Sequence, residues 1–135
     1  MKNVAKILYL VAAILGFVEF GGSVIGGIVC IAMGGIAAAT ASSNTNPEAA
    51  TVAAGTLIGV GVFLLIYMAI FLIAGIMAIK GRKALYANSA STGIHIANIV
   101  FGALTLGAIQ IAPAVLSLIV TTRENNSGVI DATGE

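Results

Sequence analysis

Residues 56–79 read TLIGVGVFLLIYMAIFLIAGIMAI, an apolar run without a charged side chain. As a helix, this run would rise about 36 Å at 1.5 Å per residue, enough to cross the roughly 30 Å hydrocarbon core of a bilayer. The basic sequence KGRK at 80–83 follows directly, and cations of this kind mark the cytoplasmic end of a span. The stretch predicts a membrane-spanning helix.

Two further charge-free runs, at 20–47 and 84–122, flank this segment. The whole chain of 135 residues is 59% hydrophobic and 8% charged, with a mean hydropathy of +1.11, whereas soluble domains carry about 25% charged residues. A soluble protein with helices this apolar would need polar faces that these runs lack. We therefore predict an all-α, polytopic membrane protein whose first partner is the lipid bilayer.

The first helix is expected to be unusually long. It starts near Val4 and runs to about Thr40, where the polar sequence SSNTNPEAA at 42–50 breaks it. Lys2 and Lys6 precede its apolar part as in a signal peptide, but the apolar sequence continues and no A-x-A-type cleavage site follows. The segment therefore reads as an uncleaved membrane anchor.

The last apolar run, Gly93–Val120, allows two interpretations. A hairpin turning around Gly107–Gln110 gives four transmembrane helices, the last with Pro113 in its first turn, where proline is tolerated. A single long helix kinked at Pro113 gives three. Four spans place all Lys and Arg residues in the cytoplasm and Glu48 outside, which the positive-inside rule favours.

We choose four spans, with the N-terminus and the basic loop 80–83 cytoplasmic in a cell membrane. Residues 1–122 are expected to form one transmembrane domain. Residues 123–135, RENNSGVIDATGE, are expected to form a polar, flexible tail.

The order of these segments resembles that of small bacterial four-helix membrane proteins of unknown function. A long Gly-rich first helix and a polar external loop are followed by a helix ending IAGIMAIKGRK at 73–83 and by GIHIANIVFGALTLGAIQIAPAVLSLIV at 93–120. The resemblance covers most of the chain and implies a bacterial inner membrane. It implies no activity, because such proteins carry no catalytic motif to transfer.

Small residues mark expected helix contacts, because helices associate in lipid through close packing. A stripe at i+4 spacing in the first helix, together with a GxxxG pair in the second, forms the predicted helix-packing groove: Gly22, Gly26, Cys30, Gly34, Ala38, Gly55 and Gly59. This groove either packs the chain's own helices or receives an oligomer partner. Cys30 is expected to act there as a small apolar residue.

Glu19 is the one charged residue inside an expected span. An ionised carboxylate at such depth is costly, so it should face protein or water or be protonated. Depth counted from the cytoplasmic edge predicts an intramembrane polar cluster of Glu19, Tyr67 and Thr105. Glu19 could bind a proton or cation in a transport pathway, could lock helix packing as a hydrogen-bonded acid, or could lie near water if the first turns follow the interface.

His95 and Asn98 form a second polar face one short turn apart. A helix-to-helix hydrogen bond explains them better than a metal site, because no second histidine completes a ligand set. One cysteine allows no internal disulfide. No catalytic pairing, phosphate loop, cofactor motif or metal motif is found, and the net charge of +1 offers no surface for nucleic acid.

Together these features predict a non-enzymatic membrane protein that acts by helix–helix association, as a homo-oligomer or as an accessory subunit of a membrane complex. The alternative is a small oligomeric channel or transporter with Glu19 in its pathway. A chain of this size encloses little volume by itself, so transport would require several copies.

Overall fold

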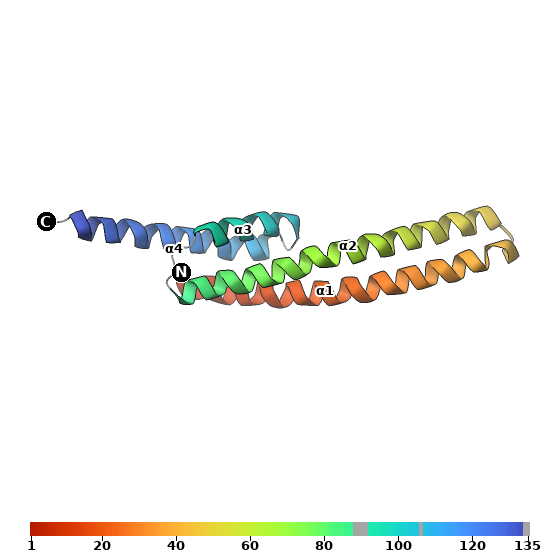
Figure 1. The fold of residues 1–135 in the computed structure, drawn as a ribbon, viewed down its shortest axis with the longest axis horizontal. Coiled ribbons are helices and arrows are strands. Elements are labelled where there is room, and N and C mark those ends of the chain that lie inside the picture. Colours follow the sequence, from red (N-terminus) through yellow and green to blue (C-terminus); the bar gives the residue numbers. More distant parts are fainter. Residues whose placement is uncertain (88–91, 106, 134–135) are drawn as a thin grey trace. The chain divides into compact units, whose positions relative to one another are not determined.

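The computed structural model describes residues 1–87, 92–105 and 107–133, with side chains as far as residue 126. Within these ranges the chain is all-helical, which confirms the predicted fold class (Figure 1). The elements are α1 (Lys2–Ala39), the 3-10 helix η1 (Ala41–Ser43), α2 (Pro47–Tyr86), α3 (Thr92–Leu104) and α4 (Ala108–Thr133).

The chain divides into two compact units. The first, here called the four-segment unit, comprises Met1–Phe17 and Phe71–Glu135. The second, the hairpin unit, comprises Val18–Ile70. Both α1 and α2 pass through the two units, with one part of each helix in either unit.

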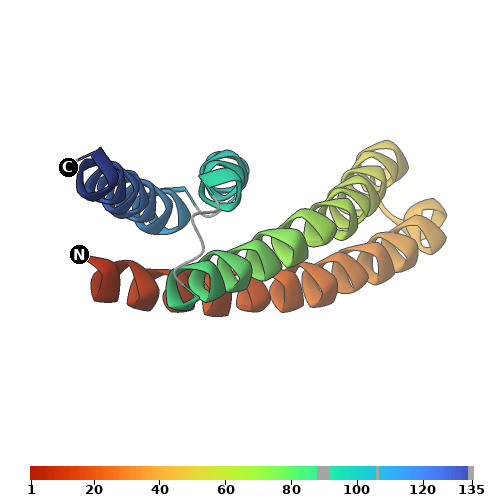
Figure 2. The ribbon, with the colours of Figure 1, turned by 60° about the vertical axis from the view of Figure 1, so that its left-hand side comes forward.

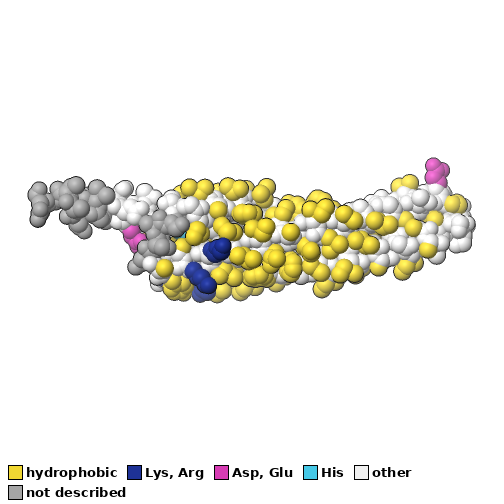
Figure 3. Space-filling view, viewed as in Figure 1, with side chains coloured by type: hydrophobic (Ala, Val, Ile, Leu, Met, Phe, Trp, Pro, Cys, Tyr) yellow, Lys and Arg dark blue, Asp and Glu magenta, His cyan; other side chains and the backbone are white. Residues whose placement is uncertain are grey.

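The two long helices are α1, with 38 residues, and α2, with 40. At 1.5 Å per residue they measure about 57 and 60 Å, roughly twice the hydrocarbon thickness of a bilayer. Of the helices in the described ranges, these two are long and apolar enough to cross a membrane (Figure 3). The long first helix predicted from Val4 to Thr40 is confirmed.

The start of α2 corrects the predicted loop at 42–50. The helix begins at Pro47, where proline needs no backbone N–H partner and has a suitable backbone angle. The side-chain oxygen of Asn46 accepts a hydrogen bond from the backbone N–H of Ala49 at 3.2 Å, which caps the helix. The connection between the long helices is therefore shorter than the sequence suggests.

In the hairpin unit, α1 and α2 lie antiparallel with large side chains seated on glycines (Figures 1 and 2). A Cβ atom built on Gly27 would lie 2.8 Å from the Leu65 side chain, and one on Gly34 would lie 2.7 Å from Ile58. On α2, a Cβ on Gly61 would lie 2.6 Å from Ile31 and 2.8 Å from the backbone oxygen of Gly27. These distances leave no room for a methyl group, so the seam requires glycine.

The seam follows a heptad rather than a four-residue repeat. Along α1, positions that are buried or half-buried recur at alternating steps of four and three residues, which is the spacing of a coiled-coil seam. In the hairpin unit these positions are Phe20, Ser23, Gly27, Cys30 and Gly34, and the same spacing continues along α1 through Tyr9, Ala13 and Gly16 of the four-segment unit.

The four-segment unit has a core of mainly small side chains. Its buried hydrophobic cluster consists of Ala5, Tyr9, Ala12, Ala13, Ala78, Leu85 and Ala114. Gly16 of α1 lies against Gly75 of α2, and a Cβ added to Gly16 would lie 2.9 Å from the Gly75 backbone. Small residues here allow α1 and α2 to approach closely before α3 and α4 complete the unit.

The apolar run Gly93–Val120 is a helical hairpin, with its turn between α3 and α4. Gly107 has a φ of 57°, which favours glycine, and its N–H donates to the carbonyl of Gly102 at 2.7 Å. Gly102 lets α4 approach, because a Cβ there would lie 2.8 Å from Ile111. Pro113 is the sixth residue of α4, so its predicted place in the first turn is wrong.

The hairpin also bears on the number of spans and on the tail. With 13 residues, α3 rises about 20 Å, less than the roughly 30 Å of hydrocarbon. At the other end, α4 continues through Thr133. Much of the stretch expected to be a flexible tail therefore belongs to a helix.

Candidate functional site

The interior of the four-segment unit contains a polar cluster, defined here as Tyr9, His95, Asn98, Gln110 and Ser117. All five side chains are fully buried. The Tyr9 hydroxyl lies 2.8 Å from Nδ1 of His95, and the two rings stack with centroids 6.0 Å apart. This contact joins α1 to α3.

Two amide side chains continue the cluster into α2 and α4. The Asn98 amide nitrogen donates to the carbonyls of Ile94, at 2.9 Å, and Met77, at 3.0 Å. The Gln110 amide nitrogen donates to the Asn98 side-chain oxygen at 2.9 Å and to the carbonyl of Ala74 at 3.2 Å. The two amides thus link three helices through directional bonds.

Glycine makes the cluster possible on the α2 side. A Cβ on Gly81 would lie 2.7 Å from the Tyr9 ring and 3.0 Å from the Asn98 amide nitrogen. On α4, the Ser117 hydroxyl donates to the carbonyl of Pro113 at 2.6 Å. The predicted polar face of His95 and Asn98 therefore joins helices: Gln110 comes from the next helix, and Tyr9 lies 86 positions from His95.

The cluster contains a phenol, an imidazole, two amides and a hydroxyl, but no carboxylate. Nε2 of His95 is buried without a hydrogen-bond partner among the described residues. A nucleophile–base pair oriented by an acid is therefore not assembled at this histidine in the part of the chain that the structure covers. Within the same ranges, no three His, Cys, Asp or Glu side chains gather as metal ligands would.

The predicted cluster of Glu19, Tyr67 and Thr105 is distributed over the two units. Glu19 and Tyr67 belong to the hairpin unit and Thr105 to the four-segment unit. Tyr67 packs on Phe63 with ring centroids 5.2 Å apart. Thr105 donates to the carbonyl of Phe101 at 2.6 Å, with the Gln110 side-chain oxygen 3.4 Å away. The joint cluster stays a prediction.

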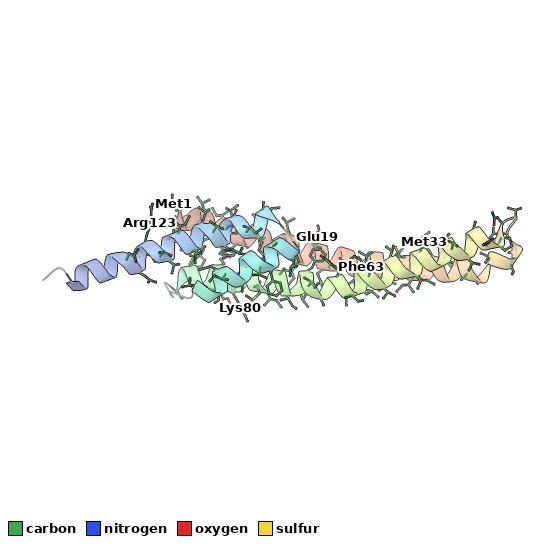
Figure 4. All side chains as sticks on the ribbon, turned by 90° about the horizontal axis from the view of Figure 1, so that it is seen from above. Met1, Glu19, Met33, Phe63, Lys80 and Arg123 are labelled. Atoms are coloured by element: carbon green, nitrogen blue, oxygen red, sulfur yellow. The ribbon has the colours of Figure 1, made fainter. Side chains whose placement is uncertain are left out.

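Glu19 itself is exposed on α1 (Figure 4). Among the residues with described side chains, it makes no hydrogen bond or ion pair. Its carboxylate is the one acidic group in the charge-poor middle of α1, since the helix has no other Asp or Glu. The hairpin unit thus presents a single acid on an apolar helix.

The glycines of the predicted groove have different environments. Gly34 belongs to the seam, and Gly26 lies beside it, where a Cβ would touch Leu64 at 3.5 Å. Cys30 is half-buried and Ala38 is exposed. A Cβ on any of the other three groove glycines would meet nothing within 4 Å; these are Gly22, Gly55 and Gly59. The groove is thus partly used within the chain and partly open.

The charged residues of the four-segment unit form several separate contacts. Lys2 of α1 pairs with Glu124 of α4 at 3.0 Å. Lys6 lies 4.0 Å from the centroid of the Tyr86 ring, and the Arg82 guanidinium lies 5.4 Å from it. The start of α1, the end of α2 and the polar part of α4 therefore meet at one end of this unit.

Comparison of the chain with protein-family models, curated proteins and solved structures found no match.

Proposed function

We propose that the chain is an integral membrane protein, non-enzymatic, that acts by association through one face of α1. This face, here called the Glu19 face, consists of Glu19, Gly22 and Gly26, which follow one another at steps of three and four residues and so share one side of the helix. The partner is a second copy of the chain or a subunit of a membrane complex. The exposed carboxylate of Glu19 on the long apolar helix α1 is the observation that supports the proposal.

The position of Glu19 along α1 places its carboxylate near the middle of the proposed span. If residues 57–79 of α2 occupy the hydrocarbon core, Met68 lies at its middle. Facing residues in the hairpin unit have numbers that add to about 90, as for Gly27 with Gly61 and Gly34 with Ile58. Met68 is then level with Gly22, and Glu19 lies about 4.5 Å from the mid-plane, at 1.5 Å per residue.

An uncovered carboxylate at that depth is unfavourable. Insertion scales put the cost of the related Asp at about 3 kcal/mol at the centre of a helix. A partner that donates a hydrogen bond, or that encloses water, removes this cost. The free protomer therefore gains free energy by covering Glu19.

The glycines beside Glu19 suit a close partner. Gly22 is exposed and a Cβ there would meet nothing within 4 Å. In lipid, helices associate through close backbone approach at small residues. A second helix lying on Gly22 and Gly26 would thus cover the neighbouring carboxylate.

The charged contacts of the four-segment unit support the proposed topology. The Lys2–Glu124 ion pair brings the polar part of α4 back to the level of the N-terminus. This is expected if α3 and α4 form a hairpin that enters the bilayer from the cytoplasmic side and returns to it. All Lys and Arg residues then lie on that side, as the positive-inside rule favours.

The test is the mass of the complex extracted in mild detergent. Gly22→Leu should reduce the assembly to single chains, with at least a tenfold weaker association, because the protomer has room for the side chain and only a partner is displaced. Gly35→Leu is the matched control, since Gly35 is also open but lies on another side of α1. A wild-type mass of one chain, or equal masses for both variants, would contradict the proposal.

The same preparations separate association from transport. Glu19→Gln keeps the shape of the side chain and its capacity for hydrogen bonds, so the assembly should persist. Any proton or cation flux through proteoliposomes containing the wild-type protein should be unchanged in Glu19→Gln. A flux lost in this variant, with the mass unchanged, would instead support the channel or transporter.

A further inference from the structure

The end of α2 and the start of α3 form an open depression of about 290 Å³, lined by Lys80, Lys83, Ala84, Ala87 and Ile94. We call this surface the basic depression. Two lysines and an apolar floor make a pattern of charge and hydrophobicity that suits an amphipathic anion. Lys80 projects outward from α2 (Figure 4).

The two lysines have no ion-pair partner among the residues whose side chains are described. Glu124 is the one acidic side chain described in the four-segment unit, and its carboxylate is paired with Lys2. Lys6 and Arg82 lie over the Tyr86 ring instead. Lys80 and Lys83 are three residues apart and therefore share a side of α2.

The start of α3 adds to the positive potential of the basic depression. Ile94 is the third residue of that helix, and the first turn contains no acidic residue. Backbone N–H groups in a first helical turn carry partial positive charge. An anion between the lysines would thus also face the favourable end of the α3 dipole.

We propose that the basic depression binds the headgroup of an anionic phospholipid, with its phosphate between Lys80 and Lys83, the outer part of the headgroup on Ala84 and Ala87, and its acyl chains directed along α2 toward Ile79. This proposal rests on the proposed location of the chain in a membrane. A zwitterionic lipid fits less well, because its own cation would approach the lysines. Lipid bound here would fix the cytoplasmic end of α2 to the headgroup layer without involving the Glu19 face.

The experiment measures how much phosphatidylglycerol stays bound to the detergent-solubilised protein, with native mass spectrometry. The wild-type protein should retain phosphatidylglycerol in preference to phosphatidylcholine. Lys80→Gln/Lys83→Gln should weaken the affinity for phosphatidylglycerol by about thirtyfold, from the contribution of each cation near an anionic lipid surface. Lys80→Arg/Lys83→Arg keeps both charges and should retain the lipid.

A second pair with the same change in net charge is the control. Lys6→Gln/Arg82→Gln removes the cations on Tyr86 and should leave occupancy within about twofold of wild type, since these cations are outside the depression. Equal losses in the two double variants would show diffuse electrostatic attraction and would overturn the site. Equal retention of the two lipids by wild type would also overturn it.

A third variant guards against a failure of the lysine variant to insert. Ala87→Leu keeps every cation but fills the floor of the depression, and it should lower phosphatidylglycerol occupancy at least fivefold. Unchanged occupancy would overturn the proposal. Failure here is distinguishable from failure of the proposed function, because the mass of Gly22→Leu reports on the hairpin unit alone.

Discussion

The two compact units hold their helices together by different means. In the hairpin unit, α1 and α2 meet through glycines on which Leu65, Ile58 and Ile31 are seated. In the four-segment unit, the polar cluster joins the helices with hydrogen bonds between Tyr9 and His95 and between Gln110 and Asn98. The first arrangement depends on shape and the second on donors and acceptors.

The difference follows from the number of helices each unit has to align. Two antiparallel helices need one continuous seam, and glycines with seated side chains provide it. Four segments can pack with different neighbours and in different registers. Directional bonds that are costly to leave unmade select one arrangement, so the polar cluster suits the more complex unit.

The largest effect is expected from breaking the seam of the hairpin unit. In Gly61→Leu, the new side chain overlaps the Gly27 carbonyl and Ile31, so the helices must separate. We expect the free energy of unfolding in mild detergent to fall by about 3 kcal/mol or more. Gly55→Leu, on an open face of the same helix, should change it by less than about 0.5 kcal/mol. Equal effects would show that the seam is not specific.

A smaller effect is expected from removing one amide of the polar cluster. Asn98→Leu leaves the Gln110 amide and the carbonyl of Met77 buried without this partner. The free energy of unfolding should fall by about 2 kcal/mol. Asn98→Leu/Gln110→Leu should cost less than the sum of the single variants, because neither amide is then left unmatched. Strict additivity of the three values would argue against a direct bond.

The smallest effect is expected at the phenol. Tyr9→Phe keeps the ring packed on Gly81 and removes the hydroxyl that contacts His95. Thermal unfolding should report a loss of about 1 kcal/mol. Tyr86 is 60% exposed, so Tyr86→Phe should leave stability unchanged. If the two variants behave alike, the hydroxyl of Tyr9 makes no net contribution and the comparison between the units weakens.

The length of the first helix and the α3–α4 turn could be predicted from local sequence, whereas α2 and α4 extend beyond the predicted apolar runs. The absence of charge between Glu19 and Glu48 extends the first helix, and Asn and Pro end the loop after it. Glycine near residue 107 allows the backbone angle that the turn needs. These signals act over a few residues and require no knowledge of neighbouring helices.

The glycine contacts were harder to predict from the sequence, because residues at four-residue spacing do not stay on one side of a helix. Each step of four residues turns by about 40° beyond a full circle, so a stripe from Gly22 to Ala38 moves from an open side across the seam. Steps of seven and eleven, as from Gly16 to Gly27 and Gly34, nearly return to the same side. A search for the heptad repeat along the first helix would have identified Gly27.

The polar cluster could be predicted only in part. His95 and Asn98 share a side of α3 at a spacing that the sequence displays. Their partners cannot be derived from this spacing. Tyr9 is 86 positions from His95 and is brought near by the packing of α1 against the α3–α4 hairpin. Pairings of this kind depend on which helices become neighbours, and one sequence does not encode that in any local pattern.

The shortness of α3 has a consequence for the surrounding lipid under the proposed topology. With 13 residues, this leg is about 10 Å shorter than the acyl layer is thick. A bilayer adjusts to a short apolar segment by thinning around it, at a cost that grows with each ångström of mismatch. The α3–α4 hairpin would therefore deform its annulus of lipids and favour partitioning of the protein into thinner membrane regions.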